Sequence, residues 1–270
     1  MKERYKKIVR GIKKTYIKLT NKKEITYKTR FGFKIILDLS KDVDSNFYFD
    51  DFENKTINYF SKVVKKGMTV FDIGANIGIY TLIASQNIKQ NGRVYSFEPA
   101  EWSYNRLQQN INLSKYNNII INKFGISDFT GEIKFHICED DAYNSIGNRP
   151  MKDVISVKTI KVFSLDDYVI LNKIGRIDII KVDTEGAEYL VFKGAEKTLM
   201  KHSPTIFFEY NPYAAKGYEF SSLEALRLVE SYGYHCYEFV EERLIEIKED
   251  KIQTFDIIGF KNPILNSTKI

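Results

Sequence analysis

The chain has 270 residues, of which 43% are hydrophobic and 28% charged, a composition that fits one large α/β domain with a buried core and excludes a largely disordered protein. No apolar run reaches the ~18 residues of a membrane span, and the N-terminus lacks the apolar core of a signal peptide, so we expect a cytoplasmic protein. The net charge of +6 arises from residues 1–23, which hold ten Lys or Arg and one Glu; the remaining chain is mildly acidic, which argues against nucleic acid as a partner.

Residues 1–23 have the pattern of a basic amphipathic helix. Their apolar side chains recur at helical spacing with lysines between them, at Tyr5, Ile8, Val9, Ile12, Tyr16 and Leu19. Such a helix can bind an anionic surface, so peripheral contact with the cytoplasmic face of a membrane is one interpretation, and a helix that docks on the body of the protein is the other. Residues 24–263 are expected to form a single domain, and residues 264–270 a loose tail.

The segment after this leader predicts a hairpin and then a helix. Residues 25–39 alternate between polar and apolar side chains around a Phe-Gly-Phe centre, which is typical of two paired strands. Residues 47–65 carry apolar side chains at helical spacing, and the pattern stops at Gly67, a residue that suits a helix C-cap.

Residues 69–85, T-V-F-D-I-G-A-N-I-G-I-Y-T-L-I-A-S, predict a buried strand that passes into a helix through a glycine-rich turn. Gly74 and Gly78 let the backbone bend and approach a ligand, and the helix offers unpaired N–H groups, which is typical of a nucleotide-binding turn. A dinucleotide fingerprint requires G-x-G-x-x-G, but here Asn76 replaces the middle glycine and Asp72 ends the strand. An acid at this point disfavours two phosphates and favours a cationic ligand with an amino-acid end, such as S-adenosylmethionine.

The rest of the chain alternates strands with helices. Strands are expected at 93–98, 118–122, 177–182 and 205–209, and helices at 101–114, 186–201 and 221–232. This order predicts an α/β protein with a mostly parallel, doubly wound sheet and helices on both faces.

Four further strands are expected in the second half of the chain. Those at 132–137 and 154–162 flank a polar loop at 139–153, whose length is typical of a lid or a binding loop. Those at 234–240 and 254–260 can pair antiparallel. Cys138 and Cys236 show neither a C-x-x-C spacing nor the density of a disulfide framework, so both are predicted to be reduced thiols.

Five segments, in order, resemble the FkbM family of S-adenosylmethionine-dependent methyltransferases. They are D-I-G-A-N-I-G-I-Y-T (72–81), S-F-E-P (96–99), G-I-S-D-F-T-G (125–131), S-L-D-D-Y (164–168) and I-D-I-I-K-V-D-T-E-G-A-E (177–188). The resemblance implies a class I methyltransferase fold, which is a Rossmann-like, seven-stranded sheet. It also implies S-adenosylmethionine as the cofactor and O-methylation of a hydroxyl on a sugar, a glycan or a secondary metabolite as the reaction.

Doubly wound sheets bind ligands beyond the carboxyl ends of their strands, so the residues just after each strand are candidates for cofactor contact. These are Asp72, Gly74, Ala75, Asn76, Gly78, Glu98, Pro99, Ser127 and Asp128. Glu98 lies 24 residues after Gly74, where an acid can accept both ribose hydroxyls; the alternative is a solvated acid at a strand end. Ser127 and Asp128 either meet the adenine amino group or form a simple turn. Glu53 matches a glutamate of the resembled family, and it either faces the cofactor or caps a helix.

The candidates for catalysis are Lys181, Asp183, Glu185 and Glu209, which follow or end two expected strands. Asp183 is predicted to remove the acceptor's proton, with Glu209 or Glu185 as its partner. The alternative for Glu185 is that it only matches the dipole of the helix that it precedes. No metal is predicted, although the same carboxylates could instead hold a hard divalent cation.

Other polar residues are assigned no catalytic role. His136, His202 and His235 are not near any strand-end motif, and residues 211–213, Asn-Pro-Tyr, are interpreted as a turn that ends a strand.

The sequence therefore predicts an S-adenosylmethionine-dependent O-methyltransferase that acts on a small-molecule or glycan acceptor. A nucleotide-dependent oxidoreductase is the alternative among enzymes, and Asn76 in the loop disfavours it. A non-catalytic binding module on the same fold is the second alternative, and the acids at every strand end disfavour that one. The sequence predicts neither the acceptor's identity nor an oligomeric state.

Overall fold

The structure is a computed structural model that describes residues 15, 23–50, 52–147, 154–241, 243–248, 252 and 254–264. Apart from residues 15 and 23, the expected leader helix lies outside the described residues, as do residues 148–153 of the expected loop and residues 265–270 of the expected tail. Within these ranges, no helix is long and apolar enough to cross a membrane.

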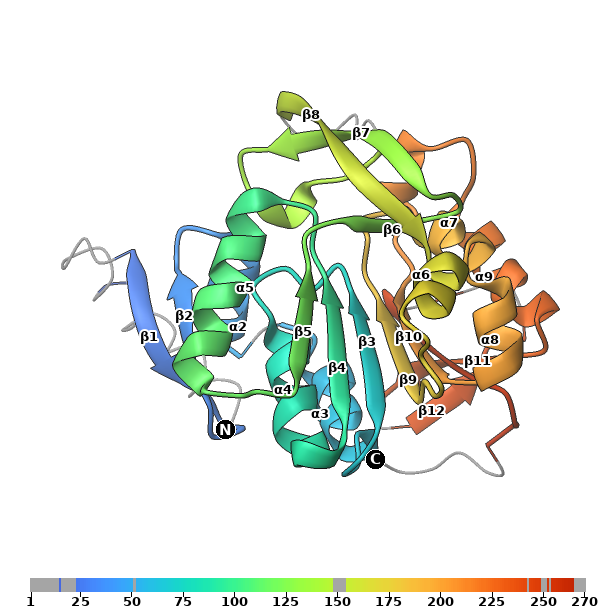
Figure 1. The fold of residues 1–270 in the computed structure, drawn as a ribbon, viewed down its shortest axis with the longest axis horizontal. Helices are drawn as coiled ribbons and strands as arrows, with labels where there is room; N and C mark the ends of the chain where they lie inside the picture. The colour runs from blue at the N-terminus through green and yellow to red at the C-terminus, as the bar shows by residue number, and fades with distance from the viewer. Residues whose placement is uncertain are drawn as a thin grey trace.

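The centre of the fold is an eight-stranded sheet in the order β12-β11-β13-β10-β9-β3-β4-β5 (Figure 1). Its five parallel strands are β5 (Ile119–Asn122), β4 (Arg93–Phe97), β3 (Thr69–Ile73), β9 (Ile179–Val182) and β10 (Thr205–Glu209). β13 (Asp256–Phe260) pairs antiparallel with β11 (His235–Val240), as the alternating runs predicted, and it lies between β11 and β10. The expected class I methyltransferase fold, α/β with a mostly parallel sheet, is confirmed.

The prediction of seven strands is wrong by one. The additional strand, β12 (Arg243–Glu246), turns back from β11 and pairs with it antiparallel at the edge of the sheet. It buries Leu244, which is 2% exposed, so a short segment with one apolar anchor completes a hairpin.

Helices cover both faces of the sheet, as expected. α3 (Asn54–Val63), α4 (Ile79–Ile88) and α5 (Glu101–Ser114) lie on one side, and α6 (Leu165–Leu171), α7 (Glu188–Lys193), α8 (Glu196–His202) and α9 (Ser222–Ser231) lie on the other (Figure 1). Two hydrophobic cores result, one under each layer. Along β3, Val70 faces the first core and Phe71 the second, because successive side chains of a strand point to opposite faces.

Two of the expected helices are each divided in two. The helix predicted at 47–65 is α2 (Asp42–Tyr48) followed by α3, and the residues between them include Asp50 and Glu53 with φ of 58° and 36°, a backbone conformation that interrupts a helix. The helix predicted at 186–201 is α7 followed by α8, divided at Gly194. A Cβ on Gly194 would lie 2.0 Å from the carbonyl oxygen of Ser127, so the chain needs glycine to pass there.

Smaller elements surround the sheet. The expected hairpin is β1 (Glu24–Lys28) with β2 (Lys34–Asp38), and the Ile36 N–H on β2 donates to Asn110 of α5 (2.7 Å). β6 (Gly125–Ser127), β8 (Val154–Ser164) and β7 (Gly131–Cys138) form a second sheet beyond the carboxyl ends of the parallel strands (Figure 1). Short 3-10 turns lie at Lys89–Asn91, Asp141–Tyr143 and Ala214–Gly217. Cys138 and Cys236 are both buried and are not joined in a disulfide.

Candidate active site

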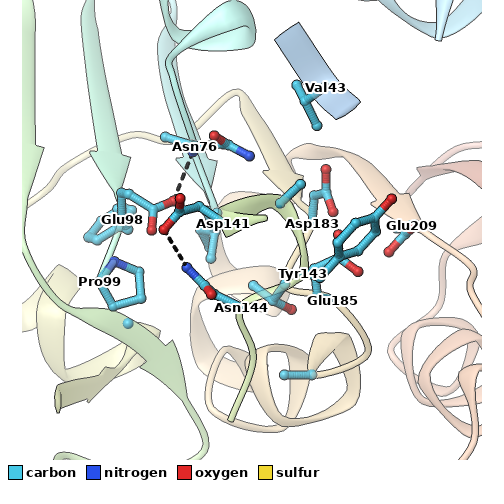
Figure 2. A pocket seen from close by; sticks show the side chains of 18 of the residues that line it. Val43, Asn76, Glu98, Pro99, Asp141, Tyr143, Asn144, Asp183, Glu185 and Glu209 are labelled. Carbon is cyan, nitrogen blue, oxygen red and sulfur yellow. Dashed lines mark hydrogen bonds between the residues drawn. The ribbon is translucent and has the colours of Figure 1, made fainter. Parts of the chain in front are cut away.

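A cavity of about 270 Å³ lies at the carboxyl ends of the parallel strands. Ten of the fourteen predicted site residues line it: Glu53, Gly74, Ala75, Asn76, Glu98, Pro99, Lys181, Asp183, Glu185 and Glu209. The two groups of acids lie apart, since Figure 2 shows Glu98 beside Asn76 on one side and Asp183, Glu185 and Glu209 together on the other. The three histidines are not among the lining residues.

The glycine-rich turn after β3 forms one wall of the cavity. The N–H groups of Gly74 and Ala75 both donate to the carbonyl of Phe97 on β4, each at 3.0 Å. Gly74 has φ of 78°, and a Cβ there would lie 1.7 Å from the carbonyl oxygen of Asp183. Only glycine therefore lets the turn lie against the end of β9. The backbone of the turn after β3 is thus in direct contact with the backbone of Asp183.

Glu98 holds the turn from the β4 side. Its Oε2 accepts the N–H of Asn76 at 2.8 Å (Figure 2), and its Oε1 accepts the N–H of Ala100, also at 2.8 Å. The side chain is 6% exposed, so the alternative of a solvated acid does not hold. Burial raises the pKa of Glu98 to about 7, although the hydrogen bonds from the two N–H groups lower it. Each oxygen keeps a second lone pair with which it can accept a ligand hydroxyl.

Four predicted residues lie outside the lining. Asp72 is beneath the turn, where its Oδ2 accepts the Thr81 hydroxyl of α4 (2.6 Å), and Gly78 precedes α4 with φ of 95°. Ser127 is fully buried on β6. Asp128 forms an ion pair with Lys193 at 2.8 Å. These contacts support the turn and the second sheet; a contact of these residues with cofactor stays a prediction.

The other end of the cavity is built from carboxylates. One oxygen each of Asp183, Glu185 and Glu209 lies within 4.8 Å of the others. Burial, with the charges of Glu185 and Asp183, raises the pKa of Glu209 well above its usual range. A group of this kind favours a cation, and its oxygens can act as proton acceptors or hold a hard divalent ion.

Lys181 is the one basic side chain among the described residues that line the cavity. Its ammonium lies 2.9 Å from Oδ2 of Asp183 and 4.8 Å from the centre of the Tyr80 ring, and the side chain is 9% exposed. Burial alone would lower the pKa of Lys181, but the charges of Asp183, Asp72 and Glu53 raise it. Lys181 is therefore a fixed positive charge beside Asp183.

Glu53 belongs to the same charged group, although it is far from it in sequence. Glu53 is the N-cap residue of α3, as the capping alternative predicted, but its side chain makes no capping hydrogen bond and accepts the hydroxyl of Tyr80. Burial, with the charges of Asp256 and Asp183, raises the pKa of Glu53 well above its usual range.

The sequence did not reveal the residues that form the rim. The Asp42 N–H of α2 donates to Asp140 (2.8 Å), and the hydroxyl of Tyr143 donates to Asp42 (2.6 Å). Residues 139–147, the described part of the expected loop, are thereby tied to α2 across the cavity. The pairing joins residues about a hundred positions apart, so no local pattern could have shown it.

The turn after β10 is as predicted. Asn211 accepts the N–H groups of Tyr213 (3.1 Å) and Ala214 (3.0 Å), and its amide donates to Glu209. The triplet 211–213 is thus a strand-ending turn that fixes the Glu209 carboxylate.

The model of the methyltransferase FkbM domain matches residues 72–236 of this chain. The hexuronic acid methyltransferase AglP of Haloferax volcanii is 28% identical over 147 residues, which are 54% of this chain and 58% of AglP. The chain thus spans less than two thirds of that relative.

Among solved structures, the methyltransferase FkbM from Methylobacillus flagellatus has a TM-score of 0.48 and 17% identity over 79% of this chain and 52% of its own. An S-adenosylmethionine-dependent O-methyltransferase from Thermotoga maritima has a TM-score of 0.46 and 13% identity over 90% and 88%.

Proposed function

Because the chain belongs to the FkbM family of methyltransferases, we propose that it transfers a methyl group from S-adenosylmethionine to a hydroxyl of a sugar, a glycan or another small molecule. The observation that carries this proposal is one cavity that has an acid suited to bind a ribose, Glu98, at one end. The carboxylates of Asp183, Glu185 and Glu209 line the other end of the same cavity. The similarity to AglP, a hexuronic acid methyltransferase, supports a sugar acceptor.

The cavity fits S-adenosylmethionine by its chemistry. In the proposal, Glu98 accepts the ribose hydroxyls with its remaining lone pairs, and the turn at Gly74–Asn76 brings backbone close to the ligand. Asn76 has φ of 49°, so it adopts without glycine the left-handed conformation that this turn needs. The Asp183 carboxylate provides the negative surroundings that suit a sulfonium and an amino group.

When bound, S-adenosylmethionine supplies a methyl group that is already activated for attack. The chain's residues then have to place the acceptor hydroxyl in line and remove its proton. In the proposal the new O–C bond forms as the C–S bond breaks, the electron pair of that bond stays on sulfur, and the proton passes to Asp183. Lys181 keeps the Asp183 carboxylate oriented through its 2.9 Å contact.

The cluster Asp183, Glu185 and Glu209 also allows a second role, in which a divalent cation held by these oxygens orients the acceptor. Assays with a chelator and with added Mg²⁺ separate the two. Activity that persists in the chelator supports the base without metal, and activity that requires Mg²⁺ contradicts it.

Incubation of the protein with methyl-labelled S-adenosylmethionine and cell extract tests the function. We expect label in the glycan or small-molecule fraction, and none with the Asp183→Asn variant as control. Calorimetry should show binding of S-adenosylmethionine and none of NAD, whose pyrophosphate the acids would repel. Label in protein or nucleic acid, or binding of NAD alone, would contradict the proposal.

We also propose that the basic leader contacts anionic membranes peripherally, on the charge pattern of residues 1–23. Deleting residues 1–22 retains Lys23, whose carbonyl accepts the N–H of Leu39 (2.7 Å). The truncated protein should bind S-adenosylmethionine as before and bind anionic vesicles less, and the difference should fade with salt. Vesicles of neutral lipid are the control. Loss of S-adenosylmethionine binding on truncation would favour the docked helix instead.

A further inference from the structure

A buried glutamate, Glu188, lies against the turn that carries Asp183 and Glu185. It is the first residue of α7, it is 2% exposed, and it does not line the cavity. Its Oε1 accepts three hydrogen bonds, two of them from Thr184, whose N–H lies at 2.8 Å and whose hydroxyl lies at 3.0 Å. The third comes from the N–H of Gly186 at 3.3 Å. Glu188 therefore holds the backbone immediately before and immediately after Glu185.

The turn has a backbone conformation that has to be imposed on it. Glu185 and Gly186 are both left-handed, with φ of 57° and 98°. A glutamate disfavours this conformation, which persists only where the surroundings fix it. On the side away from Glu188, a Cβ on Gly186 would lie 2.7 Å from the carbonyl carbon of Ala214, in the turn after β10. Glu185 is thus presented to the cavity by a turn that is packed on one side and hydrogen-bonded on the other.

The same contacts fix the backbone that follows Asp183. The N–H of Asp183 donates to the carbonyl of Ile73 on β3 (3.0 Å), and the carbonyl oxygen of Asp183 lies against Gly74. The N–H of that same peptide group belongs to Thr184 and donates to Glu188. Because a peptide group is planar, it cannot rotate without losing one of these contacts. The direction in which the chain leaves Asp183 is therefore set from two sides.

We propose that Glu188 is a positioning residue for methyl transfer: through the turn 184–186 it keeps the carboxylates of Asp183 and Glu185 directed at the place where the acceptor hydroxyl binds. The inference rests on the proposed function, in which Asp183 takes the acceptor's proton. Glu188 touches neither ligand and acts through the backbone that it holds. This role requires an oxygen that accepts hydrogen bonds and does not require a charge.

The test compares Glu188→Ala, which removes the oxygen, with Glu188→Gln, whose amide oxygen can accept the same three hydrogen bonds. The rate of label transfer is measured with methyl-labelled S-adenosylmethionine at saturation and increasing amounts of the glycan and small-molecule fraction of cell extract. In Glu188→Ala the maximum rate should fall about ten- to a hundredfold, because small displacements of catalytic groups have effects of this size, and Glu188→Gln should stay within about threefold of wild type.

Two further measurements need no acceptor. S-adenosylhomocysteine, which lacks the transferable methyl group and the sulfonium charge, should bind both variants within about threefold of wild type, because in the proposal Glu98 and the turn after β3 hold its adenosine. The amides of Thr184 and Gly186 should exchange hydrogen at least about tenfold faster in Glu188→Ala, since their acceptor is gone, and as in the wild type in Glu188→Gln.

The matched control is Asp166→Ala. The Asp166 carboxylate accepts the same kinds of hydrogen bond, from the N–H of Lys197 (3.0 Å) and from the N–H and hydroxyl of Thr198 (2.8 and 2.6 Å), and it does not line the cavity. Both alanine variants should unfold at a lower denaturant concentration than the wild type, because each loses such bonds. Only Glu188→Ala should lose its maximum rate.

Glu188→Asp decides the matter if the alanine variant does not fold. Its side chain is shorter by one methylene, so its carboxylate withdraws from the turn, and the maximum rate should fall about three- to tenfold. An unchanged maximum rate in these variants, or an equal fall in Asp166→Ala, would overturn the proposal. An equal fall in Glu188→Gln would overturn it as well, since the charge would then be responsible, and so would loss of S-adenosylhomocysteine binding in Glu188→Ala. A wild-type protein that binds S-adenosylhomocysteine but transfers no label would instead overturn the proposed function.

Discussion

Replacing Asp183 with asparagine is expected to slow methyl transfer by about 10²–10⁴-fold, the usual contribution of a general base. The amide is nearly isosteric with the carboxylate, and its oxygen can still accept from Lys181, which lies 2.9 Å from Oδ2 in the wild type. It can accept no proton from the acceptor. The affinity for S-adenosylmethionine should fall less than about tenfold, because only one of the charges facing the sulfonium is lost. Single-turnover kinetics and calorimetry measure the two effects separately.

The matched control is Asp178→Asn, the same change just before the opposite end of β9. Asp178 accepts the Thr69 N–H at 2.8 Å, a bond that an asparagine oxygen can keep, and it does not line the cavity. Its turnover should stay within about threefold of wild type, less than ~1 kcal/mol on the barrier. If Asp183→Asn behaves the same way, Asp183 is not the base and Glu209 is the next candidate. A large loss of donor affinity would make Asp183 a cofactor ligand, and rescue by Mg²⁺ would make it a metal ligand.

The arrangement of Asp183, Glu209 and Glu98 could be predicted because parallel strands end at the same edge of a sheet. Each acid follows or ends a strand with a clear apolar run, so sequence spacing alone places the three in one region. The same rule explains why the sequence did not reveal Asp256, which lies opposite Glu209 and whose charge helps to raise the pKa of Glu53. In an antiparallel strand it is the first residue, not the last, that lies at this edge, and β13 begins with Asp256.

The strand-end rule also does not say where a side chain points. Asp72 is next to last in β3, and its carboxylate turns to Thr81 under the glycine-rich turn and not into the cavity. The hydrophobic pattern of the sequence also does not show which residues adopt a left-handed backbone conformation. Glu53 interrupts an apolar helical run without changing its period, so the sequence indicated one helix where the structure has two. Such conformations depend on tertiary contacts, here the hydrogen bond between Tyr80 and Glu53.

Replacing Glu98 with alanine should weaken the binding of both S-adenosylmethionine and S-adenosylhomocysteine by about 1.5–3 kcal/mol, the range for hydrogen bonds to a charged group. Both ligands carry the ribose, so their affinity ratio should not change. The substitution also frees the N–H groups of Asn76 and Ala100, so part of the loss comes from a looser turn. The matched control is Glu101→Ala, a nearby acid that is exposed and does not line the cavity.

The pH dependence of binding gives a second measurement of the same interaction. Burial raises the pKa of Glu98 to about 7, and ribose hydroxyls donate to its ionised form, so the affinity for either ligand should rise as the pH increases through about 7. The contribution of Glu98 to the stability of the free protein has the opposite sign. Because the folded state holds this proton more tightly than the unfolded state, the free energy of unfolding should fall between the ordinary pKa of a glutamate and pH ~7.

Calorimetry and denaturant unfolding from acid to alkaline pH should therefore show affinity rising while stability falls, and Glu98→Ala should lose its share of both trends. These opposite pH dependences of affinity and stability distinguish Glu98 from a residue that only supports the fold. For such a residue, ligand affinity and the free energy of unfolding would change with pH in the same direction. An unchanged affinity in Glu98→Ala at about pH 8 would remove Glu98 from the cofactor site, because at that pH the wild-type carboxylate is ionised and its hydrogen bonds to the ribose would be fully formed.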